Sequence, residues 1–193
     1  TNALNGNTTG QNNVAVGKDS LKANDEGINN TVVGSLAMDQ NTSGSGNTAI
    51  GRAALGTNTS ADNNTAAGFK ALNLNETGTK NTAVGANALD ANTTADSNTA
   101  AGYNALTTNT TGTVNSAFGA SALEANTTGV RNTAVGSDSL PNNTTGEKNT
   151  SIGYESLKDS VDGDQNTAVG NQSLANNTSG NNNTAVGSLS VFT

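Results

Sequence analysis

Small and apolar side chains recur along this chain with a period of 17 residues. Glycine returns at every seventeenth residue from Gly17 to Gly187, and no insertion interrupts the interval. If the Asn four residues before each of these glycines is position 1, the unit reads N-T-A-V-G-x-x-A-L-x-x-N-T-T-G-x-x. Ten full units span residues 13–182, with partial units in the same phase at residues 1–12 and 183–193. The chain, residues 1–193, is therefore expected to be a single repeat domain.

The pattern within each unit predicts strands and turns, because Asn, Thr and Gly are poor residues for the interior of a helix. Glycines at positions 5 and 15 would interrupt any helix in every unit. The sequence thus predicts an all-β fold, a β-solenoid or parallel β-roll with 17 residues per coil and about ten to eleven coils. Positions 1–4 form a short strand, the position-5 glycine allows a corner, and N-T-T-G makes the return turn, with its glycine expected in the left-handed conformation.

An uninterrupted period implies that like residues stack on one another from coil to coil. Asn at positions 1 and 12 is expected to form hydrogen-bonded ladders that also satisfy backbone groups of the turns. The position-1 ladder consists of Asn13, Asn30, Asn47, Asn64, Asn81, Asn98, Asn115, Asn132, Asn149, Asn166 and Asn183. The corner glycines are Gly17, Gly34, Gly51, Gly68, Gly85, Gly102, Gly119, Gly136, Gly153, Gly170 and Gly187.

The core is expected to consist of the apolar side chains at position 4, such as Ile50, together with the Leu row at position 9. By the two-residue alternation of a strand, Thr at position 2 then shares the inward face of position 4. One Val and one Leu per coil bury little apolar surface against the entropy of ordering 17 residues. This deficit favours an oligomer in which several rods share a core.

The composition argues against most chemistry. The chain has 8 Lys and Arg against 15 Asp and Glu, a net charge of −7, and neither His nor Cys. The usual nucleophile–base pairs and soft-metal sites are therefore missing, and no cofactor, metal site or catalytic residue is expected, so the chain is not predicted to be an enzyme. An acidic chain with scattered basic residues has no footprint for nucleic acid, and no apolar run is long enough to predict membrane insertion.

The motif N-T-A-V-G resembles the S-V-A-I-G signature of YadA-like trimeric adhesin heads. The whole unit is similar to the NTAVG repeat arrays of phage tail fibres and bacterial surface fibres, and Asn81–Ala95 and Asn132–Gly146 carry it nearly intact. The resemblance covers essentially the entire chain and implies a homotrimer. It also implies two apolar rows, one containing Val16, Val84 and Val135 and the other Leu21, Leu89 and Leu140.

Four minor features have both a functional and a structural interpretation. Phe69, Tyr103 and Tyr154 share position 6 and are possible surface contacts for a receptor glycan or a neighbouring chain, although packing over the corner is the favoured alternative. Asp159, Asp162 and Asp164 suggest a calcium loop, but a solvated turn fits the spacing better. Asn-x-Ser/Thr motifs at position 12 are formal glycosylation sites, which a buried ladder would preclude. The Thr rows at position 2 and at positions 13 and 14 raise the possibility of ice binding.

The sequence thus favours a structural or adhesive segment of an extracellular fibre, on a bacterial surface or a virion. Its expected partners are further copies of itself and a host-cell or surface receptor or glycan. The first alternative is an ice-binding solenoid with Thr rows. A further alternative is a self-assembling filament subunit, joined end to end through open β-edges.

Overall fold

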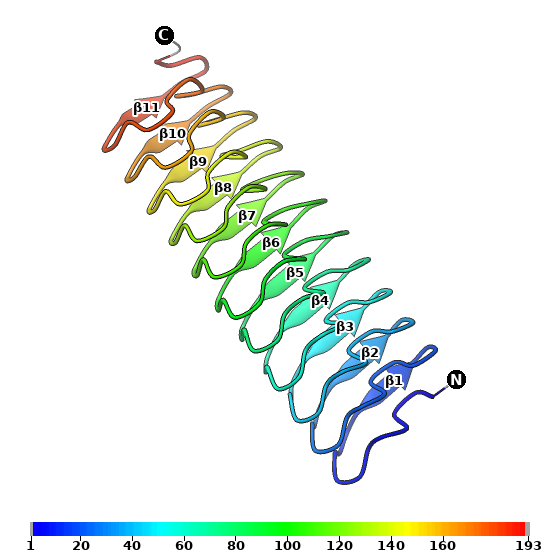
Figure 1. Cartoon of the computed structure of the whole chain (residues 1–193). Helices are drawn as coiled ribbons and strands as arrows, with labels where there is room; N and C mark the ends of the chain where they lie inside the picture. Colours follow the sequence, from blue (N-terminus) through cyan, green and yellow to red (C-terminus); the bar gives the residue numbers. More distant parts are fainter. Residues whose placement is uncertain (1, 192–193) are drawn as a thin grey trace.

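The computed structural model describes residues 2–191 and contains one short strand in each coil. The eleven strands are β1 (Val14–Val16), β2 (Thr31–Val33), β3 (Thr48–Ile50), β4 (Thr65–Ala67), β5 (Thr82–Val84), β6 (Thr99–Ala101), β7 (Ser116–Phe118), β8 (Thr133–Val135), β9 (Thr150–Ile152), β10 (Thr167–Val169) and β11 (Thr184–Val186). They form one 11-stranded sheet in chain order. Figure 1 shows them stacked in a straight file along a rod.

Neighbouring strands pair in parallel, and each residue lies opposite its counterpart one period later. Thr82, for example, pairs with Thr99, and Val84 pairs with Ala101. Turns connect the strands, and no helix occurs among the described residues. The prediction of an all-β solenoid with 17-residue coils is confirmed.

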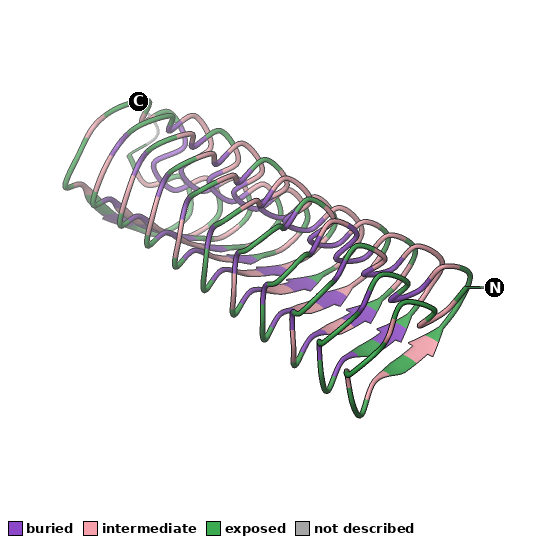
Figure 2. Ribbon diagram, turned by 60° about the horizontal axis from the view of Figure 1, so that its bottom comes forward, coloured by how far each residue is buried: buried purple, intermediate pink, exposed green. Residues whose placement is uncertain are grey.

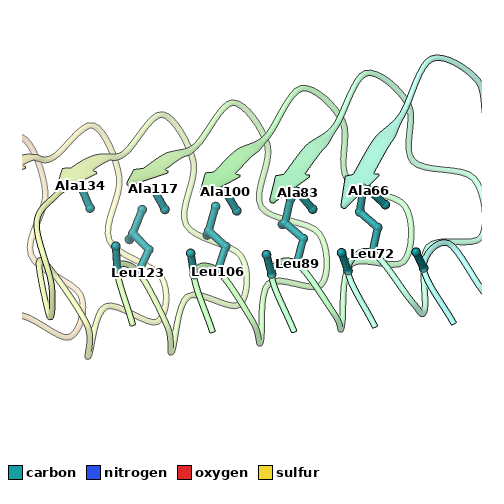
Figure 3. Close-up of a cluster of buried hydrophobic side chains, with 14 of the residues drawn as sticks. Ala66, Leu72, Ala83, Leu89, Ala100, Leu106, Ala117, Leu123 and Ala134 are labelled. Atoms are coloured by element: carbon teal, nitrogen blue, oxygen red, sulfur yellow. The ribbon is translucent and has the colours of Figure 1, made fainter. Parts of the chain in front are cut away.

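The core is narrow and consists of positions 3, 8 and 9. In the fifth coil these residues are Ala83, Ala88 and Leu89, and all three are fully buried. Figure 3 shows the Ala row on the strands facing the Leu row across the interior. Because the coil is thin, one Leu fills most of the space in most coils, and the strand contributes only the methyl group of an Ala; Val32 and Ser151 are the exceptions on the strands, and Met38 replaces Leu in the second coil.

The expectation that position 4 lies in the core, with position 2 beside it, is wrong. Strand side chains alternate between faces, and here position 3 takes the inward face. Ala83 is fully buried, whereas Val84 is 45% exposed. The physical reason is space, since a Leu in each coil leaves room for little more than a methyl group on the strand. The larger Val32 is fully buried at position 3 in the coil whose position 9 is Met38, a more adaptable side chain. Figure 2 shows the buried residue at the centre of most strands, flanked by less buried ones.

The expectation of a left-handed glycine at position 15 is also wrong. Positive φ angles occur instead at positions 7, 9 and 17 of the coils, mostly at non-glycine residues such as Asn87, Leu89 and Ser97. The position-15 residue needs a small side chain for a different reason. A Cβ on Gly78 would lie 2.4 Å from the carbonyl oxygen of Ala95 and 2.5 Å from the side-chain oxygen of Asn75.

The corner glycines at position 5 meet two constraints at once. Gly85 has a φ of 130°, which L side chains rarely adopt, and a Cβ there would lie 2.4 Å from the carbonyl oxygen of Gly102 in the next coil. Stacked corners therefore touch backbone to backbone. No larger residue fits this row without separating the coils.

The two Asn rows form buried ladders that converge on the position-15 carbonyl. In the fifth coil the amide groups of Asn81 and Asn92 donate to the carbonyl oxygen of Ala95, at 2.7 and 3.1 Å. Asn92 also donates to Asn75 in the preceding coil at 2.7 Å. The side-chain oxygen of Asn81 accepts the backbone N–H of Asn98 at 2.9 Å. Turn groups that water cannot reach are thereby satisfied.

Candidate interaction face

The most distinctive surface of the rod is the outward side of the sheet, made by positions 2 and 4 of each strand, here named the outer sheet face. Position 4 contributes an apolar row in which Val16, Ile50 and Val84 are 57%, 46% and 45% exposed. Position 2 contributes a parallel row of Thr, broken by Val14 and Ser116 and partly exposed in most strands. Both rows run along all eleven strands.

The outer sheet face carries no charge. None of the 15 Asp and Glu or the 8 Lys and Arg occupies position 2, 3 or 4 in any coil. An exposed sheet surface that is partly apolar and lacks charged residues is unusual, because charges normally protect such surfaces from association. This face therefore has the character of a contact surface.

The absence of acidic residues extends beyond the strands. We define the acid-free strip as positions 17 and 1–6 of every coil, which contains no Asp or Glu. Its only charges are cations at its two edges, namely Lys80, Arg131 and Lys148 at position 17 and Lys18 and Arg52 at position 6. All 15 carboxylates lie on the remaining positions. Charge is thus segregated around the rod.

Carboxylates lie immediately outside both edges of the strip. They are Asp62, Asp96, Glu147 and Asp164 at position 16, and Asp19, Asp138 and Glu155 at position 7. Glu155 accepts hydrogen bonds from Gln172 at 2.6 Å, Tyr154 at 2.9 Å and Lys158 at 3.1 Å. These bonds, above all the one from Gln172, lower the pKa of the Glu155 carboxyl. Glu155 consequently stays ionised to a lower pH than a free glutamate.

The position-6 aromatic residues lie at the surface. Phe69, Tyr103 and Tyr154 are 44%, 59% and 48% exposed. The guanidinium of Arg52 lies 5.7 Å from the centre of the Phe69 ring, and the ammonium of Lys70 lies 5.8 Å from it. Phe69 is therefore partly engaged in cation–π contacts. The three rings are on different coils and do not form one cluster.

The structure also places the other candidate groups. The position-12 Asn residues of the glycosylation motifs, such as Asn41 and Asn92, are fully buried and hydrogen-bonded. Among residues 2–191 no three acidic side chains come close enough to hold a metal ion, so Asp159, Asp162 and Asp164 do not converge. Thr rows at positions 13 and 14 follow the turns, interrupted by residues such as Glu76.

Residues 2–191 enclose no pocket. The described part of the chain also contains no helix that is long and apolar enough to cross a membrane. What the molecule offers a partner is therefore its elongated surface, not a cavity.

Comparison with known proteins gives no relative. No protein-family model matches the chain, and no curated protein or solved structure matches it significantly.

The outer sheet face was missed by sequence reasoning because position 4 was assigned to the core. A signal for it existed in the printed sequence. Charged residues never occur at positions 2–4 although they are common at the turns, and this distribution distinguishes a contact surface from an ordinary solvated one.

Proposed function

We propose that this chain is a structural segment of an extracellular fibre, on a bacterial surface or a virion, and that it serves as a rigid rod carrying attachment or receptor binding. The observation that carries the proposal is the outer sheet face, uncharged and partly apolar along all eleven strands. Contiguous apolar surface of this kind marks protein–protein contact. Parallel copies of the rod, three in the arrangement that we favour, would bury it.

Several further features support a mechanical role. Each coil pairs with the next through strand hydrogen bonds and two Asn ladders, so the rod is braced along its length. The position-4 row supplies the apolar surface that a shared core between chains requires. Exposed aromatic residues such as Tyr103 remain as candidates for contact with a receptor or glycan.

The test is the mass of the purified chain in solution, measured by light scattering over a dilution series. A stable trimer is expected. The variant Val84→Lys places a charge in the buried row and is expected to shift the population to monomer. Leu74→Lys is the matched control, since Leu74 is 44% exposed against 45% for Val84 but lies at position 11, away from the face. A wild-type chain that stays monomeric at high concentration contradicts the proposal.

Ice binding is a second candidate, favoured by one specific observation. The position-2 Thr row lies on the outward face, beside the apolar row, and strands in a sheet repeat every 4.7–4.9 Å or so. A flat, regular array of hydroxyl and methyl groups without charge could order water into an ice-like layer. Thermal hysteresis of a monomeric chain that disappears in Thr82→Lys would support this function. Its absence in the monomer would exclude it.

A further inference from the structure

The charges at the edges of the acid-free strip form a pattern that is complementary to itself. Position 17 precedes each strand, and position 7 follows it beyond the corner glycine. Each strand is therefore flanked, at its own level of the rod, by one position-17 residue on one edge and one position-7 residue on the other. At β8 these residues are Arg131 and Asp138. At β9 they are Lys148 and Glu155. In both coils a cation at one edge has a carboxylate at the other.

Neither Arg131 nor Asp138 has a salt-bridge partner among residues 2–191. The ion pairs found there are Lys148 with Glu147 at 4.0 Å and Lys158 with Glu155 at 3.1 Å. Asp138 accepts one hydrogen bond, from Ser137 at 3.0 Å, and Arg131 is exposed. Two opposite charges at one level on opposite edges of an uncharged face can meet only across an interface between chains.

We infer that copies of this chain associate through the acid-free strip as parallel rods in register, with Arg131 of one copy paired to Asp138 of the next. The inference rests on the proposed assembly and specifies its orientation and register. Rotation about an axis parallel to the rod brings the position-17 edge of one chain against the position-6 and position-7 edge of its neighbour at the same level. In a closed ring every chain makes this contact identically.

Charge selects this register over its neighbours. In register, Arg131 faces Asp138, Lys148 faces Glu155, and Lys80 faces the neutral Asn87. A shift of one coil in one direction keeps one opposite-charge pair, Lys148 with Asp138, but brings Lys80 against Lys70, two like charges. A shift in the other direction keeps only Arg131 with Glu155 and leaves Lys148 against the neutral Gln172. The in-register arrangement alone forms two opposite-charge pairs without a like-charge contact. Opposed charges thus supply specificity that eleven nearly identical apolar strands alone would lack.

The strip is large enough for a stable contact. Eleven strands spaced at about 4.8 Å give a length of about 50 Å, and six residue steps at about 3.3 Å give a width of up to about 20 Å. The resulting area of about 1,000 Å² per chain is shared between two neighbours, so three chains together would bury about 3,000 Å², against the roughly 1,600 Å² in total of a standard two-chain interface. The outward rows of the strand, positions 2 and 4, lie on either side of the midline of this area.

Disulfide trapping tests orientation and register together, because the chain has no Cys of its own. In the double variant Arg131→Cys and Asp138→Cys, oxidation is expected to link chains into covalent trimers on a denaturing gel. A bridge within one chain is excluded because β8, about 10 Å long, separates the two edges, and disulfides need Cα atoms roughly 4–7 Å apart. Two further double variants are controls for the register, because they pair residue 131 with position 7 of the following or the preceding coil. They are Arg131→Cys with Glu155→Cys and Arg131→Cys with Ser121→Cys, and both are expected to form few disulfides between chains.

Charge reversal supplies the second measurement. Arg131→Glu and Asp138→Arg are each expected to weaken association at least tenfold in a dilution series, and the double reversal is expected to restore it. Lys22→Glu is the control for Arg131→Glu, because it makes the same change in net charge at position 10, outside the strip. It is expected to have little effect on association. The inference is overturned, while the fibre proposal stands, if the wild-type chain assembles but two results are obtained. These are that the disulfide yield is the same for all Cys pairs, and that the dissociation constant is the same for the charge-reversed variants as for the wild type. A monomeric wild-type chain overturns both.

Discussion

At the scale of single residues, the unusual property of this fold is its left-handed backbone. Positions 7, 9 and 17 adopt positive φ in every described coil, with non-glycine values between 47° and 61°. Each such residue costs about 1–2 kcal/mol relative to ordinary conformations. The surrounding hydrogen bonds impose the conformation, as where the N–H of Leu89 donates to Ala105 of the next coil at 3.1 Å. Glycine is consequently not required at positions 7, 9 and 17, in contrast to the corner at position 5, where every residue is glycine.

The first prediction concerns Val114, a β-branched residue at position 17 with a φ of 61° and 53% exposure. Val114→Gly is expected to raise the free energy of unfolding by about 1 kcal/mol, because glycine adopts this conformation without strain and little packing is lost. Gly46 already occupies the same position with a φ of 69°. Urea denaturation is the measurement. Val130→Gly, at a neighbouring site without positive φ, is the control and is expected to destabilise; a loss of stability in Val114→Gly as well contradicts the strain argument.

At the scale of the element, the coil is held by side-chain ladders as much as by its strand. A strand of three residues offers few backbone hydrogen bonds, and the turns add others between coils, such as those from the N–H of Leu89 to Ala105 at 3.1 Å and from the N–H of Ala91 to Thr107 at 3.0 Å. The amides of positions 1 and 12 reach the position-15 carbonyl from two sides, and each also bonds to the adjacent coil. Buried polar rows of this kind stabilise the fold most where every member is satisfied. The position-12 row is interrupted at Ser160, and the side-chain oxygens of Asn143 and Ser160 are buried without a hydrogen-bond partner among the described residues.

The second prediction is that Asn109→Ala lowers the free energy of unfolding by about 2–4 kcal/mol. Asn109 donates to Asn92 at 3.2 Å and to Gly112 at 2.9 Å, and accepts from Asn126 at 2.7 Å. Its loss leaves buried partners unsatisfied, at about 1–3 kcal/mol each. Thr111→Ala, at an exposed turn position of the same coil, is expected to change stability by less than about 0.5 kcal/mol. Equal effects of the two changes in chemical denaturation would argue against the ladder as a stabilising element.

At the scale of the whole molecule, the rod is a linear array in which each strand pairs only with the strands before and after it. Stability in such an array is close to a sum over coils and the contacts between them. Length can therefore change without disturbing the remaining structure, but only in steps of the full period. The outer sheet face lengthens or shortens with the rod.

The third prediction follows from this periodicity. Deleting residues 82–98 removes one full period and joins Asn81 to Thr99, so the unit pattern continues across the junction. The shortened chain is expected to fold cooperatively. The slope of its unfolding free energy against denaturant concentration is expected to fall by about a tenth, because less surface is exposed on unfolding. Deleting residues 82–97 removes one residue fewer and displaces every row beyond the junction. Circular dichroism and urea denaturation should show a large loss of structure in the second variant alone, and similar behaviour of both would contradict the stacking requirement.

The sequence by itself determined the period, the number of coils, the absence of helix from residues 2–191 and the parallel stacking, because the 17-residue rows of Asn and Gly permit only one register. Tertiary structure decided which face of each strand is buried. Ala83 and its neighbours Thr82 and Val84 are all acceptable in a strand, and only the width of the interior, already occupied by Leu89, selects Ala83. The left-handed positions likewise escaped prediction, since residues such as Leu89 have no local preference for that conformation. Contacts between coils impose it, and those contacts exist only once the coils have stacked.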